Sequence, residues 1–113
     1  MQNIARSLLL ACAAALVPVL ASAADVKENW VKHCQKCHAA DGSGSTPVGK
    51  KLKVLNYTLP EVQAAMTDEE IVKITRDGAK DEAGKTTMPA YADKLTEEEI
   101  QAMIGLIRSF QKS

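Results

Sequence analysis

One short motif constrains this chain more than any other feature. Cys34 and Cys37 are separated by two residues, and His38 follows directly. On a helical turn, residues i and i+3 lie on one face, so both thiols can reach one edge of a porphyrin. The imidazole that follows can then project toward the iron as the proximal ligand. The Cys-x-x-Cys-His pattern is typical of covalent haem attachment, and we expect one covalently bound haem c.

Other interpretations of the motif have less support. A structural zinc site usually has four ligands, but no Cys follows Cys37 and no His follows His38. His33, directly before Cys34, crowds the same turn and cannot easily complete a tetrahedral site. A thioredoxin-like dithiol would need a β-α-β context, and no strand pattern precedes the motif. A disulfide between the two motif thiols stays open for a chain without cofactor.

The first 23 residues have the pattern of a cleaved export signal. Arg6 gives a basic start, an apolar stretch follows, and small residues occupy positions 21–23. The apolar stretch is shorter than the ~20 residues that a transmembrane helix needs, although an uncleaved anchor is an alternative. We expect a periplasmic protein in which 1–23 is removed and 24–113 forms one monohaem domain. Cys12 lies inside the signal, so the two remaining thiols belong to the motif and build no disulfide framework.

Charge is balanced overall but unevenly placed. The chain carries 14 basic and 14 acidic side chains, which gives no reason to expect nucleic acid as a partner. Residues 25–58 hold six lysines against three acids, whereas 59–113 is acidic. The lysines near the motif or the late loop are at positions 36, 50, 51, 53 and 85. We expect a monomer without a stable membrane anchor that docks redox partner proteins through an acidic patch on the partner; ordinary solvated surface is the alternative.

The hydrophobic periodicity predicts an all-α protein. Asp25 can cap a first helix that reaches Cys37, and Pro60 can open a short helix. Thr67 and Thr96 each begin a capping-box pattern. The segment after the second box has apolar residues at helical spacing, namely Ile100, Met103, Ile104, Ile107 and Phe110. No segment alternates with the period of a strand.

Together these features resemble the small class I c-type cytochromes of bacteria. Four segments carry the resemblance: Cys34–His38 in an N-terminal helix, the glycine-rich loop 41–44, Met88-Pro89 in a late loop, and a C-terminal helix that ends at Phe110. The resemblance covers nearly the whole mature chain. It implies the cytochrome c-like fold, in which N- and C-terminal helices cross beside the haem.

The crossing makes two contacts testable. We expect Trp30 to pack against Ile107 or Phe110 of the last helix. Val26 departs from the family pattern, which often has a small residue there. Gly105 is then the candidate for a close approach from the other helix.

The sixth iron ligand can be argued from the three methionines that follow the signal. Met103 lies on the apolar stripe and Met66 precedes a helix cap. Met88 lies in an irregular segment, where a loop can present a thioether and the next residue, a proline, stiffens it. The family places its axial Met in a similar loop. We expect His38 and Met88 as axial ligands, with another methionine, His33 or an open site as alternatives.

The resemblance also assigns Pro47 as the residue whose carbonyl accepts a hydrogen bond from His38; an ordinary turn proline is the alternative. A His/Met pair leaves iron no free position for oxygen or substrate and raises the reduction potential. We therefore expect a one-electron carrier between respiratory or other redox partners, and not an enzyme. The alternative is a haem subunit, or a sensor or enzyme with an open or displaceable sixth ligand.

Overall fold

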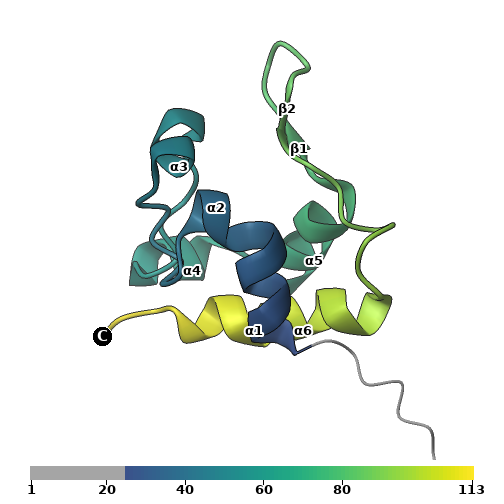
Figure 1. The fold of residues 1–113 in the computed structure, drawn as a ribbon. Helices are drawn as coiled ribbons and strands as arrows, with labels where there is room; N and C mark the ends of the chain where they lie inside the picture. Colours follow the sequence, from purple (N-terminus) through teal and green to yellow (C-terminus); the bar gives the residue numbers. More distant parts are fainter. Residues whose placement is uncertain (1–24) are drawn as a thin grey trace, which may run out of the picture.

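The computed structural model describes residues 25–113, so the expected export signal lies outside the described residues. The helices in chain order are α1 (Val26–Asn29), the π-helical turn η1 (Trp30–Cys34), α2 (Gln35–His38), α3 (Pro47–Leu52), α4 (Pro60–Ala65), α5 (Asp68–Asp77) and α6 (Glu97–Ser109). Strand β1 (Ala79–Lys80) pairs antiparallel with β2 (Thr86–Met88). Figure 1 shows α1 beside α6, and the hairpin projecting from the end of α5.

The prediction of an all-α protein is wrong in one element. The two strands are only two and three residues long. Alternation cannot become visible over so few residues. The molecule is rich in helix and carries one small sheet, which contains Met88.

The first helix forms where the sequence predicts it, but its period changes midway. Asp25 caps the helix by accepting a hydrogen bond from the backbone N–H of Lys27 at 2.8 Å. In η1 the bonding widens, and the N–H of Gln35 donates to the carbonyl of Trp30. Such π-helical turns are rare and occur often at functional sites. Cys34, which is buried, is the last residue of this turn.

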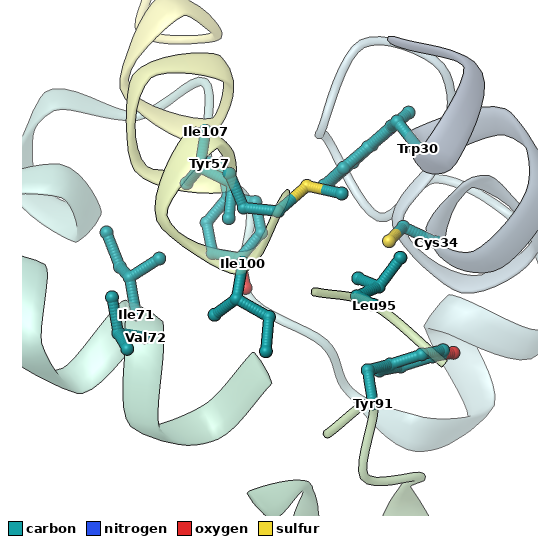
Figure 2. Packing of buried hydrophobic residues seen from close by; sticks show 10 residues of the cluster. Trp30, Cys34, Tyr57, Ile71, Val72, Tyr91, Leu95, Ile100 and Ile107 are labelled. Carbon is teal, nitrogen blue, oxygen red and sulfur yellow. The ribbon is translucent and has the colours of Figure 1, made fainter. Parts of the chain in front are cut away.

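Both predicted capping boxes are confirmed. Thr67 and Thr96 each accept a hydrogen bond from the backbone three residues on, and a glutamate returns the bond in each case. Together these bonds satisfy otherwise free donors of the first turns. The apolar stripe of α6 also faces inward: Ile100, Met103 and Ile107 are buried, and Ile104 and Phe110 pack against the cluster. Figure 2 shows this core between α5, with Ile71 and Val72, and the helix that carries Trp30 and Cys34.

Two residue pairs help to join α1–η1 to α6 and the residue that caps it. The rings of Trp30 and Phe110 are 4.8 Å apart, which confirms the predicted aromatic contact. The buried amide of Asn29 donates to the carboxylate of Glu99 at 2.5 Å. The suggestion that Gly105 provides the close approach is wrong, because a Cβ there would meet nothing within 4 Å.

Candidate cofactor site

A single cleft brings the motif and Met88 together. Two adjoining hollows, of about 150 Å³ and 200 Å³, share six lining residues: Cys34, His38, Leu55, Tyr57, Ile74 and Met88. We refer to the two adjoining hollows together as the cleft. Cys37 and His33 line the larger hollow, so two thiols, two imidazoles and one thioether border the same space.

The two thiols are free in the structure, so the disulfide alternative is not observed. Burial, with a smaller effect from the neighbouring Cys37, raises the pKa of Cys34 to about 11. Cys34 is therefore a protonated thiol near neutral pH. Within residues 25–113, no group of three or more His, Cys, Asp or Glu side chains could hold a metal ion, which gives the zinc alternative no support.

The imidazole of His38 is enclosed by two aromatic rings. It is 9 % exposed; the Tyr57 ring lies 5.3 Å from it, nearly parallel at 17°, and the Trp30 ring lies 5.6 Å away. Burial lowers the pKa of His38, which favours the neutral form that binds metals. Its Nδ1 atom is buried and has no hydrogen-bond partner among the described residues. The expected bond from His38 to the carbonyl of Pro47, the first residue of α3, is not formed among the described residues, so it stays a prediction.

Helix α3 packs directly on the backbone of the motif. A Cβ at Gly49 would lie 2.2 Å from the carbonyl oxygen of Cys37 and 2.4 Å from that of Gly44. The Thr46 hydroxyl donates to the Cys37 carbonyl at 3.1 Å, and the N–H of Gly44 donates to the His38 carbonyl at 2.9 Å. Sequence reasoning missed Gly49, because a glycine inside a short helix carries no sign of what it will touch.

The residue after His38 has a backbone conformation that side chains disfavour. Ala39 has φ 65° and ψ 165°, a region used almost only by glycine that costs about 1–3 kcal/mol. The indole N–H of Trp30 donates to the Ala39 carbonyl at 2.9 Å. This bond helps to hold the strained peptide and the end of the helix that carries His38.

Met88 reaches the cleft on the second strand of the hairpin. Its backbone pairs with Ala79. Gly78, with φ 74°, lies under the same segment, and a Cβ there would be 2.4 Å from the Met88 carbonyl oxygen. Met66 and Met103 border only the smaller hollow, so Met88 is the one methionine of the described residues that borders both.

A buried glutamine supports the ring that stacks on His38. Gln63 is 3 % exposed, and its amide donates to the carbonyls of Tyr57 at 2.7 Å and Ile107 at 2.8 Å. The guanidinium of Arg108 donates to the Gln63 side-chain oxygen at 3.0 Å. Sequence analysis did not single out this residue, because a polar side chain in a short helix looks like solvated surface.

The border of the cleft is largely apolar, with Lys53 and Glu70 beside it. Leu55 is 52 % exposed and Ile74 is 39 % exposed, although both line the cleft. Lys53 lines the larger hollow. All five lysines that the sequence singled out are exposed, and the other four, at 36, 50, 51 and 85, line neither hollow. The structure thus places one of the five at the cleft.

The comparisons with known proteins agree with this geometry. The model of a family described as cytochrome C oxidase, cbb3-type, subunit III matches residues 21–107. The chain belongs to this family of c-type cytochromes. Among curated proteins, none matches this cytochrome.

Two solved structures are similar to this cytochrome. The KustC0563 c-type cytochrome is 31 % identical with a TM-score of 0.68, over 78 % of this chain and 99 % of that chain. A tyrosine-to-phenylalanine mutant of Kustc0563 is 30 % identical with a TM-score of 0.65, over 77 % and 99 %. These matches support the cytochrome c-like fold and a small class I c-type cytochrome, as the sequence predicted.

The family implies a covalent haem c and electron transfer. The residues present fit that group, because two free thiols, the buried His38 imidazole and the Met88 thioether line one largely apolar cleft. Within residues 25–113, no helix is both long and apolar enough to cross a membrane.

Proposed function

We propose that this cytochrome is an exported one-electron carrier. Its haem would be attached through Cys34 and Cys37, and His38 and Met88 would be the axial ligands of the iron. The observation that carries the proposal is that all four side chains border one cleft. When bound, the haem supplies an iron that gains or loses one electron.

The residues of the proximal side prepare His38 for this role. Burial keeps the imidazole neutral, so no proton competes for the ligating nitrogen. The rings of Tyr57 and Trp30 limit its rotation. Nδ1 would still need an acceptor, and the Pro47 carbonyl remains our candidate for that second hydrogen bond.

The residues on the Met88 side of the cleft would control the access of small ligands and the reduction potential of the iron. A thioether from Met88 would fill the position that oxygen or another small ligand needs, which argues for a carrier and against an enzyme. Leu55 and Ile74 line the same cleft and would limit the entry of water. Thioether ligation and an apolar surrounding both favour the reduced state and raise the potential.

The remaining parts of the proposal follow from the sequence. Residues 1–23 would direct export and be removed, which leaves 24–113 as one domain in the periplasm. One Cys-x-x-Cys-His motif corresponds to one haem. We propose that the cytochrome is a monomer that meets redox partners through the border of the cleft, where Lys53 favours a partner with an acidic patch.

Intact-mass measurement of protein matured in an exporting host tests the attachment. We expect the mass of the chain without residues 1–23 plus one haem. The oxidised protein should also show the weak near-red absorption band that reports a Met–iron bond. A bare polypeptide mass, or a high-spin spectrum that responds to carbon monoxide, would contradict the proposal.

A second candidate is a subunit of a larger complex. The description of the matching family, which names a subunit of an oxidase, favours this candidate. Purification from the native membrane and soluble fractions separates the two. A free carrier is recovered alone, whereas a subunit is recovered with its complex.

A further inference from the structure

Tyr91 connects the Met88 segment to the helix that carries the motif. Its side chain is 7 % exposed. Its hydroxyl donates a hydrogen bond to the backbone carbonyl of His33 at 2.8 Å. The ring also meets the His33 imidazole edge-on, with centroids 5.4 Å apart at 64°. His33 directly precedes Cys34, so this contact lies at one wall of the cleft.

The other contacts of the Met88 segment reach α5 and its C-terminal end. Met88 pairs with Ala79 and passes over Gly78. The backbone N–H of Tyr91 donates to the Thr75 carbonyl at 3.1 Å. These contacts hold the segment to α5, but they do not set its position relative to the motif helix.

The Tyr91 hydroxyl supplies that missing connection. Within the described residues, the bond from Tyr91 to His33 is the one hydrogen bond that joins residues 86–92 directly to residues 26–38. The accepting carbonyl lies in η1, where the helical bonding is widened. A π-helical turn at this point is itself typical of a functional position.

We propose that Tyr91 is a positioning residue for the sixth ligand. Its hydroxyl holds the Met88 segment against the motif helix and would thereby hold the thioether at the cleft that His38 also lines. This inference rests on the proposed function, in which Met88 ligates the iron. Tyr91 acts through the backbone of its own segment and does not itself ligate the metal.

The variant Tyr91→Phe tests this role, because it removes the hydroxyl and keeps the ring. We would titrate the oxidised holoprotein with imidazole, which competes with Met88 for the iron. Loss of one neutral hydrogen bond should make imidazole bind about 2- to 10-fold more tightly. Amide hydrogen exchange across residues 86–91 should become faster in the same variant.

The control variant is Val72→Ala. Val72 is buried on α5 and lines neither hollow of the cleft. This change should lower the midpoint of chemical unfolding and leave imidazole affinity unchanged. Unchanged affinity in Tyr91→Phe would overturn the inference, and so would an equal tightening in Val72→Ala.

The variant Met88→Ala separates this inference from the proposed function. If Met88→Ala leaves the near-red band and imidazole affinity unchanged, Met88 is not the ligand and the proposed function fails. If Met88→Ala abolishes the band while Tyr91→Phe changes nothing, only the role of Tyr91 is refuted.

Discussion

The two sides of the cleft are built differently. On the proximal side, His38 lies between two aromatic rings, and α3 packs within contact of the motif backbone. On the other side, Met88 lies on a hairpin with exposed neighbours, held by Gly78 and by Tyr91. The proximal side belongs to the core, and the Met88 side is attached to it. Substitutions on the two sides should therefore affect stability and ligation to different degrees.

Among substitutions at the glycines, the largest effect should come from Gly49→Ala. The new Cβ would overlap two backbone carbonyls, which cannot move without displacing the motif. We expect the free energy of unfolding to fall by about 3 kcal/mol, the upper end for overpacking, and haem attachment to become inefficient. Urea denaturation and the yield of holoprotein measure both effects.

The matched control for Gly49 is Gly105→Ala. It also replaces a helical glycine, but the added Cβ meets nothing within 4 Å. Because alanine favours helix more than glycine, stability should rise by about 0.5–1 kcal/mol. Similar destabilisation by both substitutions would contradict the close packing of α3 on the motif.

The next effect in size should come from Gly78→Ala on the Met88 side. Its Cβ would meet the Met88 carbonyl at 2.4 Å, and its φ of 74° adds strain. We expect a loss of about 2 kcal/mol together with a weaker near-red band, because Met88 is pushed from its place.

Gly84→Ala provides the comparison for this prediction. Gly84 has a φ of 81°, but a Cβ there meets nothing within 4 Å. Alanine at this position would have the strained backbone conformation but no close contact with other atoms. Stability should therefore fall by about 1 kcal/mol, and the near-red band should persist. A weaker band in Gly84→Ala, or a normal one in Gly78→Ala, would show that Gly78 does not place Met88.

The smallest effect should be a gain in stability from Ala39→Gly. Glycine adopts the Ala39 conformation without the strain that a Cβ causes, and this outweighs its greater freedom in the unfolded chain. We expect a gain of about 1 kcal/mol in thermal or urea unfolding. Ala102→Gly, an exposed helical site, should lose about 1 kcal/mol. A loss in both would mean that the Ala39 backbone is not strained.

The sequence predicted correctly those features that depend on neighbouring residues or on a known motif. The motif predicted a haem protein because its spacing and its histidine are both required by one chemistry, and the family match supports it. Thr67 and Thr96 predicted helix starts, because a capping box involves only four neighbouring residues. The contact of Trp30 with Phe110 followed from the resemblance to a known helix crossing.

The features that were missed depend on tertiary contacts or on a one-residue change of period. The π-helical turn adds one residue to an otherwise regular helix, and periodicity does not detect that. Gly49 and Gly78 lie so close to other backbone that a Cβ at either position would overlap it. The hydroxyl of Tyr91 and the amide of Gln63 find partners that are distant in sequence. Such partners can be identified only from the tertiary structure.

The comparison of Met88→Ala with Met103→Ala tests the central claim most directly. Met103 is buried in α6 and borders the smaller hollow, so it is the alternative thioether. We predict that Met88→Ala abolishes the near-red band, admits carbon monoxide and lowers the potential. Met103→Ala should keep the band and lose about 2–5 kcal/mol of stability, as buried Met→Ala changes do. The opposite pattern, with the band lost only in Met103→Ala, would contradict the assignment of His38 and Met88 as the axial pair.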